Sequence, residues 1–148
     1  MKNLKKYLLG IGMLLLTVSF SHAQGILGKW KTVDDETGET KSIVELYNKD
    51  GKVYGKVTKL LLPEDKGKVC EKCSGSEHNK PIEGMIIVKG LSKEKDSNEY
   101  EGGSILDPKK GKEYKCKMWI DKEKPNLLNV RGYVAFFFRT QQWHRVTD

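Results

Sequence analysis

Residues suited to catalysis are scarce in this sequence. Only three histidines and three cysteines occur among 148 residues, and His22 lies in the leading segment, which leaves His78 and His144. The chain has no Gly-x-Ser-x-Gly elbow, no His-Glu-x-x-His run and no glycine loop of the phosphate-binding type. We therefore expect a protein that is not an enzyme and that needs no cofactor.

Long apolar runs are absent after Phe20. The one such run, Tyr7–Phe20, covers about 14 uncharged residues behind a start with three lysines, and a membrane span needs roughly 18–20. Small residues follow at the positions that a signal peptidase reads, ending at Ala23. The pattern predicts a secretory signal over residues 1–23, cleavage before Gln24, and one domain over residues 24–148 of an exported protein, periplasmic or secreted. No cysteine follows the cleavage position, so a lipid anchor is not expected.

The sequence also lacks a concentrated block of charge. The chain has 27 Lys and Arg against 20 Asp and Glu, a net charge of +7; subtracting the three lysines of the leading segment leaves 24 basic residues and +4. Both signs are interspersed, and the most basic stretch, residues 67–73, has no aromatic residue. A nucleic-acid partner would call for basic residues gathered on one element, so none is expected.

Short runs of alternating character, separated by turn signals, fill the rest of the chain. Turn signals recur every eight to twelve residues, and no segment shows a 3.6-residue apolar period. We expect strands at 27–33, 42–47, 53–61, 84–91, 99–106, 112–120, 126–135 and 139–146. Eight strands with mostly hairpin-length connections predict an all-β fold, a single antiparallel up-and-down barrel.

The seventh run places a charged residue in an apolar strand. Leu128, Val130 and Val134 share one face, while Arg131 and Tyr133 share the other. If the second face is the barrel interior, Arg131 would meet a ligand carboxylate. If that face is outside, Arg131 is a surface cation, and the apolar set facing the core favours this second interpretation.

Two short motifs stand at the ends of the strand pattern. Gly28-x-Trp30 opens the first strand and Trp143-x-Arg145 closes the last one. A glycine two positions before a tryptophan leaves room beside the indole, and an arginine can stack on the indole face. The arrangement resembles the calycins, the lipocalin and fatty-acid-binding superfamily, in which it implies a barrel closed by Gly28, Trp30 and Arg145.

A second resemblance covers nearly all of residues 24–148. Its motifs include Asp50-Gly51-x-Val53-Tyr54-Gly55, Cys70-x-x-Cys73, Gly102-Gly103-x-Ile105-Leu106-Asp107-Pro108 and Val130-Arg131-Gly132-Tyr133. Together they resemble an exported bacterial family called domain of unknown function 2147. The resemblance implies a fold and an address outside the cytoplasm, and it brings no activity or catalytic residues.

The cysteines allow three interpretations. In an oxidising compartment Cys70 and Cys73 favour a disulfide. A thiol-redox role needs a helix N-terminus that this pattern does not offer, and zinc would need Cys70, Cys73, His78 and Cys116 together. No metal is expected, and Cys116 fits a small buried apolar residue.

These patterns support three hypotheses for function. The first is binding of a small apolar or amphipathic ligand in the barrel of a monomer, since an eight-strand barrel has room for one. The candidate ligand-binding residues are Trp30, Tyr54, Tyr114, Arg131 and Tyr133. The second is an envelope scaffold acting through its surface or the loop Pro63–Pro81. The third is a thiol-redox or metal-binding protein using Cys70 and Cys73.

Overall fold

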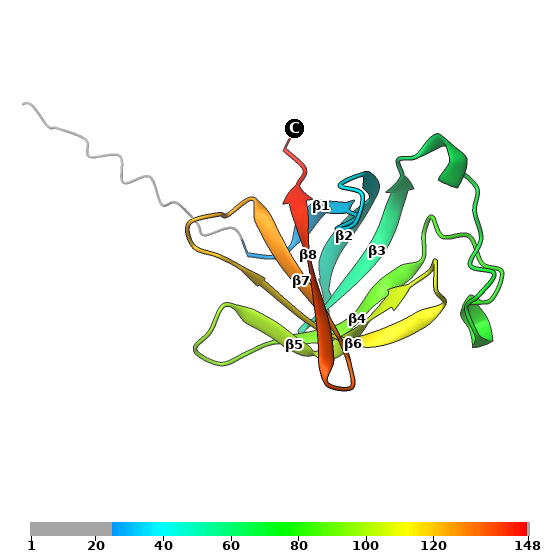
Figure 1. Ribbon diagram of the computed structural model, residues 1–148. Coiled ribbons are helices and arrows are strands. Elements are labelled where there is room, and N and C mark those ends of the chain that lie inside the picture. Colours follow the sequence, from blue (N-terminus) through cyan, green and yellow to red (C-terminus); the bar gives the residue numbers. More distant parts are fainter. Residues whose placement is uncertain (1–24, 148) are drawn as a thin grey trace, which may run out of the picture.

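Eight antiparallel strands close on themselves in chain order. The computed structural model describes residues 25–147, so the predicted signal and its cleavage position, Ala23 and Gln24, lie outside the described part. Each strand pairs with the next, and β8 pairs back onto β1 (Figure 1). The strands are β1 (Gly28–Val33), β2 (Thr40–Lys49), β3 (Lys52–Leu60), β4 (Ile86–Lys93), β5 (Glu99–Asp107), β6 (Lys112–Ile120), β7 (Leu127–Val134) and β8 (Phe137–Arg145). The predicted all-β, eight-strand barrel is confirmed.

The strand that closes the barrel is held by a short seam. Only Trp30↔Arg145 and Lys31↔His144 are in register between β1 and β8, whereas β7 and β8 align over eight positions. A further backbone bond, from the Val146 N–H to the Lys29 carbonyl at 2.9 Å, extends the seam by one residue. The first and last strands therefore meet over a small part of their length.

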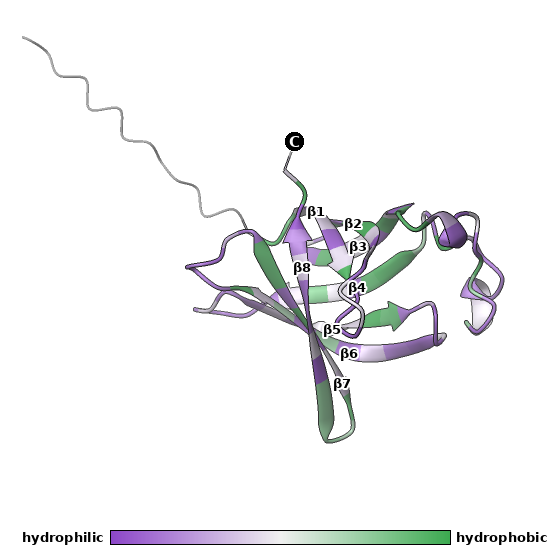
Figure 2. Cartoon of the chain, turned by 45° about the horizontal axis from the view of Figure 1, so that its top comes forward, coloured by the Kyte–Doolittle hydropathy of each residue, from purple (hydrophilic) through white to green (hydrophobic). Residues whose placement is uncertain are grey.

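The core is the apolar interior of the barrel. Alternate residues of the strands are buried, as in β2, where Ser42, Val44 and Leu46 point inward. Figure 2 shows the same alternation as hydrophobic and hydrophilic bands along the strands. Trp30, Val88, Leu91, Met118 and Leu128 have no accessible surface. Such complete burial of large side chains shows that much of the barrel is filled.

The connection between β3 and β4 is the one long loop of the barrel. It carries two 3-10 turns, η1 (Pro63–Asp65) and η2 (Gly75–Glu77), and a Cys70–Cys73 disulfide. The sulfur of Cys70 lies 3.2 Å from the Pro108 carbonyl oxygen, and Gly111 is packed against the backbone of Lys72. The loop is thus fastened to the β5–β6 turn, the nearest connection at the same end of the barrel.

Strand boundaries differ from the sequence expectation where backbone geometry intervenes. β4 begins at Ile86 rather than at residue 84, because Gly84 has a φ of 90° and the Met85 N–H turns back to the Ile82 carbonyl. β8 begins at Phe137 rather than at residue 139, since Val134 and Phe137 pair across a two-residue turn. This second shift places apolar residues at a hairpin tip.

Candidate ligand site at the open end of the barrel

The five candidate ligand-binding residues do not share one site. Trp30 is fully buried at one end of the barrel, and Tyr114 is half-buried on the inner face of β6 near the other end. Tyr54 lies outside, where its ring stacks on Tyr47 with centroids 6.1 Å apart. Arg131 and Tyr133 also lie on the outer face, since their neighbours Val130 and Gly132 occupy the inner one. Tyr114 is therefore the candidate at an accessible inner position, and Tyr133 borders the same hollow from the outer face.

One end of the barrel is closed around Trp30. The guanidinium of Arg145 lies 4.1 Å from the centroid of the Trp30 ring and donates to the carbonyls of Leu27 and Gly25 at 3.2 and 3.0 Å. The Trp30 indole N–H donates to the Ile26 carbonyl at 2.8 Å. Gly28 has a φ of 118°, and a Cβ there would stand 3.6 Å from the guanidinium.

Burying the charged guanidinium of Arg145 at the closed end costs free energy. Burial lowers the pKa of Arg145 from its ordinary value, because the interior solvates the charged form less well than water does. The Nε of Arg145 is buried with no hydrogen-bond partner among the described residues. Stacking and carbonyl contacts offset that cost, and Trp30 itself has no accessible surface at this end.

Arg131 belongs to an aromatic stack on the outside. Its guanidinium lies 4.9 Å from the Trp119 ring centroid and 4.3 Å from that of Phe138, and its Nε donates to the Thr140 hydroxyl at 2.8 Å. Tyr133 lies beside Phe138, with centroids 6.3 Å apart. Trp119 thus sits on the polar face of β6 because it covers a cation of the neighbouring strand.

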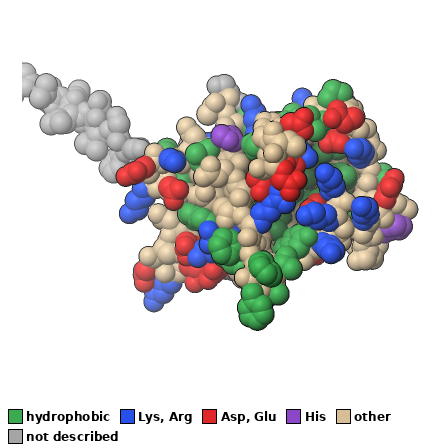
Figure 3. All heavy atoms as spheres, in the orientation of Figure 1, with side chains coloured by type: hydrophobic (Ala, Val, Ile, Leu, Met, Phe, Trp, Pro, Cys, Tyr) green, Lys and Arg blue, Asp and Glu red, His purple; other side chains and the backbone are tan. Residues whose placement is uncertain are grey.

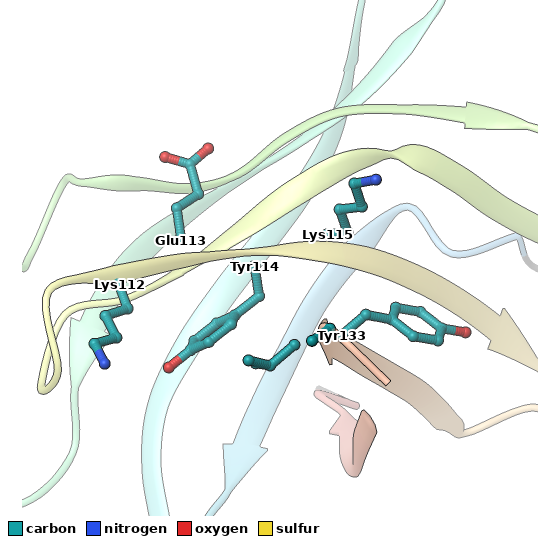
Figure 4. A pocket seen from close by; sticks show the side chains of 7 residues that line it. Lys112, Glu113, Tyr114, Lys115 and Tyr133 are labelled. Carbon is teal, nitrogen blue, oxygen red and sulfur yellow. The ribbon is translucent and has the colours of Figure 1, made fainter. Parts of the chain in front are cut away.

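A hollow opens where β6 and β7 part. Their register runs from Ile120↔Leu128 only as far as Lys115↔Tyr133, and beyond this point the strands diverge. The hollow has a volume of about 500 Å³ and is open to solvent. It is lined by Lys112, Glu113, Tyr114, Lys115, Tyr133, Val134 and Ala135 (Figure 4). Apolar and aromatic surface therefore lies next to two lysine side chains.

The lysines of this hollow have no acidic partner. Within residues 25–147, no carboxylate oxygen lies within 4.0 Å of the ammonium of Lys112 or Lys115. Glu113 is engaged elsewhere, by the Ser104 hydroxyl and by Lys89 at 3.6 Å. Positive charge at the hollow is thus available to an anionic group.

An ion cluster occupies another part of the open end. The carboxylate of Asp35, in the β1–β2 loop, accepts both from the guanidinium of Arg139 and from the amide of Gln141, and Glu36 lies 3.2 Å from Arg139. The hydrogen bond from Arg139 lowers the pKa of Asp35 and the same pair raises that of Arg139. The cluster holds the β1–β2 loop against β8, with Arg139 bridging both carboxylates.

A second hollow borders the first on the β5 side. It has a volume of about 470 Å³ and is lined by Glu94, Glu101, Gly102, Gly103, Lys115, Cys116, Lys117 and Tyr133. Lys117 is paired there with Glu99 at 2.6 Å, which raises the pKa of that lysine. The fixed ion pairs and mixed charge make this hollow less suited to an apolar molecule.

The cysteines do not form a chemical centre. Burial raises the pKa of the Cys116 thiol to about 12, so it stays protonated and unreactive at neutral pH. Within the described residues, no three His, Cys, Asp or Glu side chains gather in a way that would hold a metal ion. His78 bonds the Cys73 carbonyl through Nδ1 at 3.0 Å, a contact inside the long loop.

The sequence interpretation missed the apolar tip beside the hollow. Phe136, Phe137 and Phe138 follow directly on Val134 and Ala135, and all three rings are exposed. The signal was present, because the expected strands ended at residue 135 and resumed at 139, which left three consecutive phenylalanines in the connection. Only the two-residue turn between Val134 and Phe137 shows that these rings stand at a tip.

The whole barrel is matched by the model of one protein family. The model of a family described as an uncharacterized protein conserved in bacteria, DUF2147, matches residues 28–145. The chain belongs to the DUF2147 family. Its matched region begins at the closed end with Gly28 and finishes with Arg145, so the family spans the complete barrel. A comparison with curated protein sequences finds no match.

A solved structure shares the architecture of this DUF2147 protein. It is described as "Protein HP1028 from the human pathogen Helicobacter pylori belongs to the lipocalin family". The two chains are 20% identical, the alignment covers 82% of this chain and 83% of the other, and the TM-score is 0.69. At this identity the likeness shows a lipocalin-like fold. In the described part of this chain, no helix has the length and apolar character to cross a bilayer.

Proposed function

We propose that this protein is exported and binds one small amphipathic molecule with an anionic group at the open end of its barrel, without catalysing a reaction. The observation that carries the proposal is the hollow between the diverging β6 and β7. It combines the aromatic and apolar surface of Tyr114, Val134 and Ala135 with the unpaired cations Lys112 and Lys115. The apolar part of a ligand would contact the aromatic and apolar side chains, and its anionic group would bind the two lysines.

The lipocalin-like fold supports this choice of end. In the barrel described here, Trp30, Trp143 and Leu128 fill the interior toward the closed end. The β6–β7 gap is an accessible hollow where apolar inner-face residues reach the surface. Ligand sites commonly combine apolar walls with a few placed polar groups, which is the composition of this hollow.

Binding of decanoate, measured by titration calorimetry, tests the proposed site. We expect decanoate to bind and the neutral decanol to bind more weakly, because hydrogen bonds to charged groups are worth about 1.5–3 kcal/mol. A Lys112→Gln/Lys115→Gln variant should lose about tenfold in decanoate affinity or more. The control Lys56→Gln, an exposed lysine on β3, should bind decanoate as the parent does.

Native mass spectrometry of protein recovered after export supplies an independent check. The recovered chain should begin at Gln24 and carry a small molecule, released on unfolding, for chemical identification. Protein that is consistently empty and that binds neither decanoate nor decanol would contradict the proposal. Equal binding by the double lysine variant would contradict the role of the two cations.

A further inference from the structure

The β7–β8 hairpin ends in an exposed apolar tip. Phe136, Phe137 and Phe138 are 99%, 78% and 61% exposed, and Val134 is 53% exposed. Four of the six large apolar side chains exposed in the described chain thus belong to one turn. The hairpin extends beyond the other strands in Figure 1, and its tip forms a projecting hydrophobic knob in Figure 3. We call residues 134–138 the phenylalanine tip.

The geometry of the turn does not require apolar side chains at these positions. Val134 and Phe137 pair directly, so Ala135 and Phe136 form a two-residue connection. Ala135 has a φ of 49°, a conformation in which glycine or asparagine is favoured, and hairpin turns of this length commonly carry Asn-Gly or Gly-x. A sequence optimised for the turn would be polar, and packing within the barrel does not use the Phe136 ring.

Cations without acidic partners surround the base of the phenylalanine tip. Lys112 and Lys115 share the hollow with Val134 and Ala135, and Arg131 stacks on Phe138. Within residues 25–147, none of these three cations has a carboxylate oxygen within 4.0 Å. The acidic side chains Asp35 and Glu36 near β8 are both engaged by Arg139 rather than by these three cations. An apolar knob with unpaired cations at its base fits a surface whose outer layer is anionic and whose interior is apolar.

We propose that the phenylalanine tip docks this protein onto the interface of a bilayer that contains anionic lipids. Phenylalanine side chains lodge at the boundary between headgroups and acyl chains, while basic residues beside them attract anionic headgroups. The net charge of residues 24–148, 24 basic against 20 acidic, has the sign that such a surface attracts. Docking in this way holds the open end of the barrel against the membrane.

A second copy of the chain fits the phenylalanine tip less well than a lipid bilayer does. The three rings together expose roughly 500 Å², since a phenylalanine offers roughly 200 Å². A stable interface buries about 800 Å² on each partner, and two projecting knobs apposed to each other offer no groove that would enlarge the contact. A lipid interface accepts a projecting tip without a complementary shape.

Flotation with lipid vesicles tests the proposal, using protein recovered after export so that its N-terminus is the natural one. One set of vesicles is phosphatidylcholine, and the other contains equal parts of phosphatidylcholine and phosphatidylglycerol. We expect the parent protein to float with the anionic vesicles and about tenfold less with the neutral ones. The Phe136→Ser/Phe137→Ser variant should lose at least tenfold in binding to the anionic vesicles.

The control variant is Leu27→Ser, which removes an exposed apolar side chain, 45% accessible, at the closed end. It should float as the parent does, and thermal unfolding should show the same midpoint for parent and tip variant. Because neither Phe136 nor Phe137 lines the hollow, the Phe136→Ser/Phe137→Ser variant should still bind decanoate, which separates this proposal from the proposed ligand site.

Three outcomes would overturn the proposal. The first is a parent protein that stays free of both vesicle types. The second is equal flotation by the parent and the tip variant. The third is sedimentation showing a dimer that the tip variant abolishes, with no vesicle binding, which would assign the tip to a second copy. Equal binding to neutral and anionic vesicles would refute the part assigned to the cations.

Discussion

At the scale of single residues, Arg145 connects three separate segments at the closed end of the barrel. It stacks on Trp30, bonds the carbonyls of Leu27 and Gly25, and lies near the Pro125 carbonyl at 3.5 Å. These contacts join the segment before β1, the β6–β7 connection and the last strand. A lysine has the same charge but cannot reproduce the planar fork that reaches them.

An Arg145→Lys change should therefore destabilise the barrel. We expect the free energy of unfolding to fall by about 2–3 kcal/mol, from loss of a desolvated cation–π contact and of carbonyl partners. Urea denaturation followed by tryptophan fluorescence measures the change. The neighbouring His144 is exposed, and His144→Gln should stay within about 0.5 kcal/mol of the parent. A loss as small for Arg145→Lys as for the control would contradict the closing role of Arg145.

At the scale of elements, the packing of β5 against β4 depends on a missing side chain. A Cβ at Gly103 would collide with backbone atoms of Lys89, Gly90 and Leu91, which cannot swing aside as the end of a flexible side chain would. We expect Gly103→Ala to lower the free energy of unfolding by about 1–3 kcal/mol, the usual range for overpacking. Urea denaturation is again the measurement.

Gly132 provides a matched control for this change. Both Gly103 and Gly132 pair with Cys116, one on each side of β6, but a Cβ at Gly132 would find its nearest neighbour, the Tyr114 Cβ, at 3.6 Å. Gly132→Ala should therefore cost less than Gly103→Ala. Equal losses would show that the β4–β5 backbone approach can relax.

The β1–β2 loop makes the fold sensitive to acid. Lys41 bonds Asp34 at 2.6 Å, and with the N–H groups of Thr37 and Glu36 it holds the pKa of Asp34 far below its usual range. Arg139 likewise lowers the pKa of Asp35. Since the unfolded chain binds these protons near pH 3.9, the stabilisation is present above that pH and is lost as the pH falls toward the folded-state values.

The free energy of unfolding should accordingly decrease below about pH 4. An Asp34→Asn variant keeps a side-chain oxygen that accepts from the loop N–H groups but loses the ion pair, so its decrease should be smaller. Urea denaturation across a pH series measures both chains. The control is Glu123→Gln, an exposed carboxylate in the β6–β7 connection, which should follow the parent. A parallel decrease in Asp34→Asn would exclude Asp34 as a source of the acid sensitivity.

At the scale of the whole molecule, alternation along the strands predicted the barrel well. Period-two patterns and turn residues are local, and they determine which segments become strands and in what order they pair. The placement of Arg131 outside followed from the apolar residues Val130 and Val134 on the opposite face. The expected Cys70–Cys73 pairing also depended on short spacing and is present in the structure.

The site was harder to predict, because it depends on where neighbouring strands separate. Tyr54 and Tyr114 were both candidates on expected strands, yet one stacks outside on Tyr47 and the other borders the hollow. The hollow exists because β6 and β7 lose register after Lys115↔Tyr133, a property of the pair of strands that neither segment shows alone. Likewise, the expected strands 126–135 and 139–146 left the three phenylalanines in a connection, and only the pairing of Val134 with Phe137 shows that this connection is a tight hairpin turn.

The short seam between β1 and β8 has a mechanical consequence. The strands are antiparallel, so the beginning of β1 and the end of β8 lie at the same end of one ladder, next to the Trp30↔Arg145 pair. A force that pulls the two chain ends apart therefore loads the seam like a zipper, opening one hydrogen bond after another rather than all of them at once. The barrel should yield to such tension at low force, with the Arg145 stack as the first contact to break.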